Sequence, residues 1–220
     1  NMTWAEVLDA MARLYGRTDL AQEAERVRET VRRQSWTGKW FCDNAVRQAD
    51  GTLKLSGECT ETCQYYAFFF GIATPETHPS LWKTLVDEFG PKRYDPNDRR
   101  KMLAHPGIWP SNAFIGNYLR LELLARAGLA KNIVDETRGY FLYMADRTGT
   151  LWENDTPARS SCNHGFASHA AVLLVRDVLG VREIDSVRRT VTLRAGAVPL
   201  ARCSVTLPTP DGKMTLGWTR

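Results

Sequence analysis

The feature that most constrains this 220-residue chain is the alternation of two kinds of helical segment. One kind is apolar on nearly every side, as fully buried helices are, and comprises 61–72, 112–127 and 164–179. The other kind is amphipathic, with a charged or polar face, and comprises 19–35, 79–89 and 130–146. This order predicts a mainly α fold in which each inner helix is paired with an outer helix, the arrangement of an α/α toroid.

The lengths of the connections predict where a binding site lies. Short connections leave the buried helices, whereas long ones enter them, at 36–60, 91–111 and 147–163. In antiparallel helical hairpins, all three long segments then lie at one end, over the N-termini of the inner helices. The helix dipole favours anions and polar ligands at such ends, and loops on a rigid scaffold commonly carry function. We therefore expect the three segments to form a binding rim.

The number of helices predicts an incomplete ring. The predicted helices are about half of the roughly twelve that a closed ring of six hairpins needs. The chain therefore corresponds to a partial ring. Because its inner helices are apolar all round, a half ring on its own exposes an apolar face, which predicts self-association.

The pattern changes near residue 185. From there, apolar and polar residues alternate, and the segments 189–194, 201–207 and 213–219 are predicted as strands of a three-stranded antiparallel sheet. Pro210, Asp211 and Gly212 supply a turn between the last two strands. The predicted division is a helical domain at 1–184 and a β-strand segment at 185–220 that begins a β-sandwich.

Charge and composition exclude several classes of partner. The formal net charge is +4, and the one dense basic cluster, at 26–33, alternates with Glu25 and Glu29, which predicts a solvated helix face and no nucleic-acid surface. No run of about 18 apolar residues occurs, so no membrane span is predicted. The five cysteines are odd in number and widely spaced, which favours buried free thiols. No metal site or cofactor is predicted.

The third long segment carries the strongest candidate for chemistry. Glu153 follows Trp152 in this loop, and Asn163 and His164 stand at the entrance to the next buried helix. An inverting glycosidase needs a carboxylate base to activate water, and a neighbouring indole can desolvate that carboxylate or stack on a sugar ring. His164 can bind a sugar hydroxyl or orient Glu153. The alternatives are a structural loop carboxylate and a helix-terminal histidine satisfied by the backbone.

The other two long segments supply further candidates for substrate binding. His105 and Trp109 lie in the second segment, and Trp40 and Glu58 lie in the first. The indoles are candidate sugar platforms or loop anchors. Glu58 is a candidate second carboxylate, as is Glu61, which is equally explained as a partner of the helix dipole.

Several motifs resemble one enzyme family. Gly-Thr-Leu-Trp-Glu at 149–153 and Cys-Asn-His-Gly-Phe at 162–166 resemble the C-terminal half of the (α/α)6 catalytic domain of bacterial α-L-rhamnosidases. The segments 62–67 and 109–114 look similar to earlier inner-helix entrances of that domain, and 193–220 resembles the start of its C-terminal β-domain.

The resemblance implies a function and two departures. It implies inverting hydrolysis of terminal α-L-rhamnosides without metal or cofactor, with Glu153 as general base and a rhamnose-containing glycan or glycoside as partner. The loop from Glu153 to His164 is shorter than is typical for the family. The family's acidic Asp-Glu-Arg-x-Gly-Trp-type segment, which supplies the general acid, does not occur in these 220 residues. Without that acid, the chain alone is predicted to be inactive.

Two other functions are compatible with the sequence. One is a different sugar-active α/α toroid, either an unsaturated uronyl hydrolase or an epimerase, although an epimerase calls for more histidines at the rim. The other is a non-catalytic carbohydrate-binding module, which retains the tryptophans and lacks the acid pair.

Overall fold

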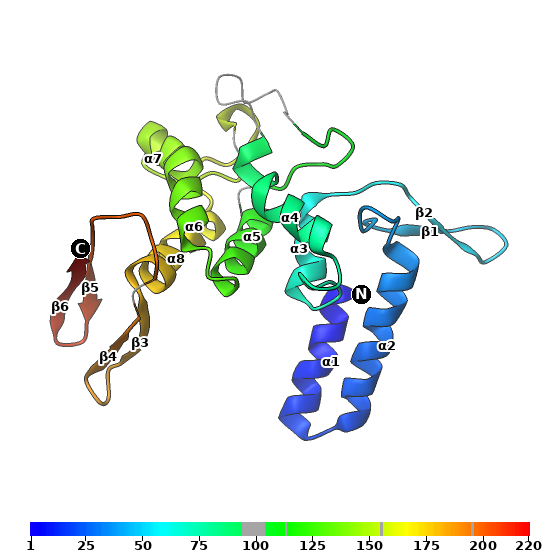
Figure 1. The fold of residues 1–220 in the computed structure, drawn as a ribbon, viewed down its shortest axis with the longest axis horizontal. Coiled ribbons are helices and arrows are strands. Elements are labelled where there is room, and N and C mark those ends of the chain that lie inside the picture. The colour runs from blue at the N-terminus through cyan, green and yellow to red at the C-terminus, as the bar shows by residue number, and fades with distance from the viewer. Residues whose placement is uncertain (94–103, 113, 155, 195) are drawn as a thin grey trace. The chain divides into compact units, whose positions relative to one another are not determined.

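The computed structural model describes residues 1–93, 104–112, 114–154, 156–194 and 196–220 (Figure 1). The described part is mainly α-helical with small antiparallel sheets, as the sequence predicted. It divides into two compact units, 1–111 and 112–220. This division differs from the boundary predicted at 184/185, which falls within a strand. None of the described helices is both long and apolar enough to cross a membrane.

The first unit begins with a helical hairpin. Helix α1 (Met2–Tyr15) ends at Gly16, whose left-handed φ of 63° lets the chain reverse into α2 (Thr18–Ser35). Arg28 of α2 is buried, pairs with Asp9 of α1 and donates from Nε to the carbonyl oxygen of Phe70 at 2.9 Å. This guanidinium therefore ties the hairpin to the C-terminal end of the next helix.

The rest of this unit surrounds a short inner helix. Helix α3 (Glu61–Phe69) is capped by Thr60, whose Oγ1 accepts from the backbone N–H of Cys63 at 3.0 Å. It ends three residues before the predicted 61–72. Strands β1 (Ala45–Arg47) and β2 (Leu53–Leu55) form an antiparallel hairpin, with Gly51 at a φ of 85°. Helix α4 (Pro79–Asp87) and a 3-10 turn, η1 (Gly90–Arg93), follow.

The two long segments of this unit meet at the N-terminus of α3. The backbone N–H of Trp109 donates to the carbonyl oxygen of Cys59, and that of Glu61 donates to the carbonyl oxygen of Trp109, each at 2.9 Å. Segments 36–60 and 104–111 therefore share one end of the inner helix, as predicted. Residues 94–103 of the predicted segment 91–111 lie outside the described residues.

The second unit is built on two buried helical segments. Helix α5 (Ile115–Arg126) is followed by α6 (Ala130–Glu136), a π-helical stretch η2 (Thr137–Phe141) and α7 (Leu142–Thr148). After the 3-10 turn η3 (Pro157–Arg159), the last helical segment comprises η4 (Gly165–Ser168), α8 (His169–Leu173) and the π-helical η5 (Leu174–Leu179). Arg120 and Glu136 form a fully buried ion pair at 2.7 Å that joins α5 to α6.

The predicted three-stranded sheet is wrong. Strand β3 (Val181–Asp185) pairs with β4 (Thr190–Leu193), and β5 (Arg202–Thr209) pairs with β6 (Gly212–Thr219), in two separate antiparallel sheets. Strand β3 was not predicted. It begins directly after Gly180 and pairs with β4, which lies within the predicted strand 189–194. The indole N–H of Trp218 donates to the carbonyl oxygen of Leu179 at 2.9 Å, so the second hairpin is anchored to the end of η5.

Candidate active site

The loop between α7 and η4 folds back on itself. Gly149 ends α7 with a left-handed φ of 72°. Beyond it, the backbone N–H of Glu153 donates to the carbonyl oxygen of Ser161, and that of His164 donates to the carbonyl oxygen of Leu151, each at 2.9 Å. We call residues 150–164 the strap. Its two backbone bonds bring the Trp152-Glu153 pair next to the Asn163-His164 pair, the proximity that the sequence predicted.

Trp152 anchors the strap. Its side chain is completely buried, its indole N–H donates to Thr148 Oγ1 at 2.7 Å, and Tyr143 packs against it with 5.9 Å between ring centroids. The ring therefore presents no face to a ligand in this conformation. Two roles were predicted for Trp152, namely desolvating the Glu153 carboxylate and stacking on a sugar ring. The buried position favours the first role, together with positioning of the strap, because stacking on a sugar would require the ring to be uncovered.

Glu153 lies half-buried in the strap. Its Oε2 accepts a long hydrogen bond of 3.4 Å from the backbone N–H of Ser161, so the side chain bends back along the loop. Within the described residues, no basic side chain forms an ion pair with this carboxylate. A carboxylate held by backbone groups and not neutralised by a cation is free to accept a proton from water.

His164 has an imidazole nitrogen that lacks a partner. Its ring packs on Phe114, with 4.4 Å between centroids, and lies 5.9 Å from the ring of Phe166. Nε2 is buried and forms no hydrogen bond with any described residue. Such orphaned atoms are uncommon because burying them costs free energy. Asn163, beside it, is exposed.

In the first unit, Trp40 and His105 come together. Their rings meet edge to face at 5.4 Å, and Phe89 packs against both. His105 Nε2 lies 2.7 Å from Glu88 Oε2, and the residue has a left-handed φ of 54°, which is uncommon outside glycine. His105 is therefore held by a carboxylate and an indole, from segments far apart in the sequence.

Trp109 and Glu58 lie at the N-terminus of α3. Trp109 is pinned by its backbone, yet 65% of its surface is exposed, so its indole is available to a ligand. Glu58 is exposed, and its carbonyl oxygen accepts from the backbone N–H of Asp43 at 2.9 Å.

Glu61, the other carboxylate considered, is buried. It accepts hydrogen bonds from Tyr65 Oη, the Gly90 N–H and the Ser111 N–H at 3.1–3.2 Å. This geometry favours a structural role for Glu61.

Sequence reasoning missed three residues that shape these clusters. Phe114 supports the ring of His164, Glu88 holds His105, and Asp43 Oδ1 accepts from both the N–H and the hydroxyl of Thr60. Phe114 does lie in the motif at 109–114, which was a usable signal. The other two had none, because each meets its partner 17 positions away in the chain.

One solved structure is similar over the whole chain. It is the 1.9 Å crystal structure of a GH78-family rhamnosidase of Bacillus sp. GL1, with a TM-score of 0.72 and 21% sequence identity. The fold is rhamnosidase-like. The likeness covers all of this chain and 23% of that one, so the chain spans about a quarter of the length of the protein it resembles. No protein-family model and no curated protein matches this sequence.

Proposed function

We propose that this chain is part of an inverting α-L-rhamnosidase-type glycoside hydrolase and supplies its general base, Glu153. The observation that carries the proposal is the strap. Its two backbone hydrogen bonds bring the backbone around Glu153 close to that of His164. The Glu153 carboxylate is half-buried and unpaired with any described cation, and His164 Nε2 has no described hydrogen-bond partner. The rhamnosidase-like fold supports the same conclusion independently of these contacts.

The proposed reaction uses two carboxyl groups. Glu153 removes a proton from a water molecule, whose oxygen attacks the anomeric carbon as the glycosidic bond breaks. A carboxylic acid about 6.5–9.5 Å from the base protonates the departing oxygen, and the sugar is released with inverted configuration. In the family that the sequence resembles, that acid belongs to a segment that these 220 residues do not contain. His164 Nε2 is buried, so it would gain a sugar hydroxyl as its partner only in a conformation that uncovers this atom.

The first unit carries the other residues that are proposed to bind sugar. The exposed indole of Trp109 can stack on the apolar face of a sugar ring. The cluster of Trp40 and His105 offers an aromatic surface and a histidine fixed by Glu88. Glu58, exposed beside the start of α3, can accept hydrogen bonds from sugar hydroxyls.

The test is Glu153→Gln in the protein that contains this chain together with its general acid. With an aryl α-L-rhamnoside as substrate, turnover should fall by roughly two to four orders of magnitude, the usual contribution of a positioned acid or base. KM should change little, because an amide fills the same space. Added azide should restore part of the rate and give a glycosyl azide of inverted configuration.

A matched control separates the base from a general effect of charge. Glu183, on β3, is exposed, so Glu183→Gln removes the same charge without touching the strap. This variant should hydrolyse the substrate at the normal rate. Near-normal turnover in the Glu153→Gln enzyme would show that Glu153 is a structural loop carboxylate.

A binding function without catalysis is the second candidate, and the exposure of Trp109 favours it. The 220-residue chain on its own should bind sugars and hydrolyse no aryl rhamnoside. If the complete protein also binds without hydrolysing, and an unsaturated uronide is not cleaved either, the binding function is the correct one.

A further inference from the structure

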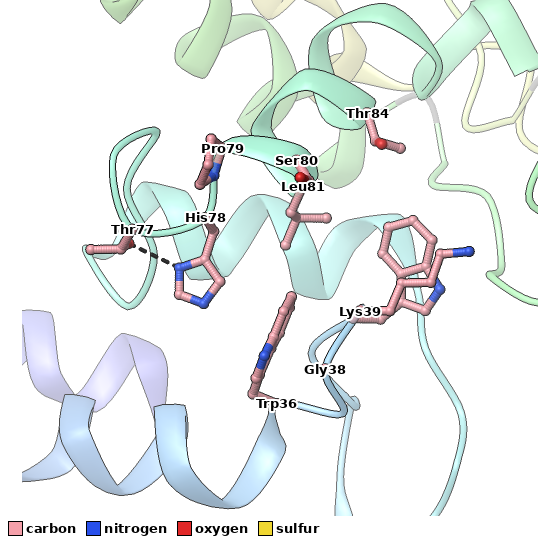
Figure 2. Close-up of a pocket in the computed structure, with 10 residues that line it drawn as sticks. Trp36, Gly38, Lys39, Thr77, His78, Pro79, Ser80, Leu81 and Thr84 are labelled. Atoms are coloured by element: carbon pink, nitrogen blue, oxygen red, sulfur yellow. Dashed lines mark hydrogen bonds between the residues drawn. The ribbon is translucent and has the colours of Figure 1, made fainter.

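A second candidate site lies in the first unit, in a cavity of about 330 Å3 between the end of α2 and the start of α4 (Figure 2). This volume is near the lower end of the range of about 300–1,000 Å3 that is usual for small-molecule sites. Two tryptophans, Trp36 and Trp40, line it. None of the residues of the strap takes part in this cavity.

The two indoles are held rigidly. Trp36 packs on Phe41 at 4.9 Å between ring centroids and meets the edge of His78 at 4.8 Å. Trp40 packs on Phe89 at 5.6 Å. Because rigid aromatic rings lose little conformational entropy on binding, a pair of fixed indoles is well suited to the apolar face of a pyranose ring.

Polar groups surround the indoles. Hydroxyls of Ser80 and Thr84 line the cavity. His78 Nδ1 lies 2.9 Å from Thr77 Oγ1, which leaves Nε2 without a partner among the described residues. Burial and the nearby charge of Arg32 lower the pKa of His78, whose ring packs against Trp36.

The lining of the cavity includes a basic side chain, Lys39. Among the described residues that line it, none is acidic, and the Lys39 ammonium lies 5.0 Å from the centroid of the Trp40 indole. Figure 2 shows His78 and Lys39 on opposite sides of Trp36. Arg32 lies near His78 but is paired with Glu25 at 2.7 Å, so Lys39 is the cation offered to a ligand here. A carboxylate is therefore favoured over a cationic or strongly basic ligand.

We propose that this cavity binds an acidic pyranose, a sugar residue of the uronate class. The pyranose ring lies against Trp36 and Trp40, its hydroxyls meet the hydroxyls of α4, and its carboxylate pairs with Lys39. This site shares Trp40 with the substrate contacts proposed above, but it goes beyond the proposed hydrolysis and does not include Glu153.

The test is a titration of the 220-residue chain with D-glucuronate and, separately, with D-glucose. Tryptophan fluorescence and calorimetry measure the binding. Glucuronate should bind with a Kd of about 1 mM, roughly tenfold more tightly than glucose. Lys39→Gln should remove this preference and leave glucose binding unchanged. Lys83→Gln is the matched control, because Lys83 is an exposed lysine of α4 that pairs with Asp87 and does not line the cavity.

Further variants make the result decisive. Trp36→Leu should abolish binding of both sugars, and circular dichroism checks that it folds. Glu153→Gln should bind glucuronate like the unmodified chain, which separates this site from the proposed catalytic one. The absence of saturable binding by either sugar would overturn the proposal. Equal binding of the two sugars, unaffected by Lys39→Gln, would overturn its acidic specificity.

Discussion

The backbone N–H of His164 donates to the carbonyl oxygen of Leu151 at 2.9 Å, and this hydrogen bond joins the two ends of the strap. The two residues stand on either side of the candidate base, Glu153. Its position is therefore determined by the loop's own backbone and by the buried ring of Trp152. Substitutions that loosen the strap should therefore reduce catalysis even at residues that do not contact the substrate.

Trp152→Phe tests whether this tryptophan anchors the strap. The change removes the indole hydrogen bond to Thr148 and part of a fully buried ring, so the free energy of unfolding should fall by about 1–3 kcal/mol. In the complete enzyme, kcat should fall while KM changes by less than about twofold. Trp4→Phe, at an exposed indole of α1, is the control. A large rise in KM with little loss of kcat would instead indicate that Trp152 contacts the sugar.

Glu61→Gln tests whether Glu61 is structural. Its buried carboxylate accepts from Tyr65 Oη and from the N–H groups of Gly90 and Ser111. A glutamine directs an NH2 group at one of these donors, so urea unfolding should show a loss of about 2–3 kcal/mol. Glu58→Gln, on the exposed side of the same helix entrance, should stay within about 0.5 kcal/mol of the unmodified chain. A Glu61→Gln chain of normal stability would reopen Glu61 as the second carboxylate.

Local sequence signals predicted the helices and the strap. Apolar residues on all sides marked the buried segments. One short sequence motif at each end of the strap marked its place in the chain. These features depend on neighbours along the chain, which a single sequence displays.

Long-range pairing was not predictable in this way. The choice of β3 as partner for β4 and the contact of Phe114 with His164 depend on which segments meet in space. The breaks of the last helical segment into 3-10, α and π stretches likewise reflect tertiary packing. The same applies to the cavity, because Trp36 and His78 meet across 42 positions of sequence.

The acid stability of the second unit should depend on Glu122. This carboxylate of α5 lies 2.8 Å from His169 Nε2 and 3.0 Å from Arg176, so it joins α5 to the last helical segment. Burial raises the pKa of Glu122, but hydrogen bonds and charge from Arg176 and His169 outweigh it and lower the pKa below 4.5. Since the unfolded chain binds the proton more readily, this stabilisation is present above about pH 4.5 and is lost as the pH falls through the folded pKa.

Glu122→Gln should therefore flatten the dependence of the melting temperature on pH below about 4.5, and should cost about 1–3 kcal/mol at neutral pH. Thermal unfolding between about pH 3 and pH 7 measures both effects. The exposed-site variant Glu183→Gln should keep the acid slope of the unmodified chain. An unchanged slope in Glu122→Gln would show that other carboxylates control the acid transition.

Self-association should occur through α1. Five large apolar side chains form an exposed stripe along this helix: Trp4, Val7, Met11, Leu14 and Tyr15. Their spacing of three to four residues places them on one face, and Leu14 is 75% exposed. Water contact with a continuous apolar stripe is unfavourable, so a second copy of the 220-residue chain should cover it.

Analytical ultracentrifugation should therefore show a monomer–dimer equilibrium that shifts with concentration, and Met11→Glu combined with Leu14→Glu should weaken it at least about tenfold. Gln22→Glu combined with Gln34→Glu adds the same charge on exposed positions of α2 and should leave the equilibrium unchanged. A chain that sediments as a monomer at every concentration, with or without the α1 changes, would contradict this prediction. Equal weakening by both pairs of variants would mean that net charge controls association and the stripe does not.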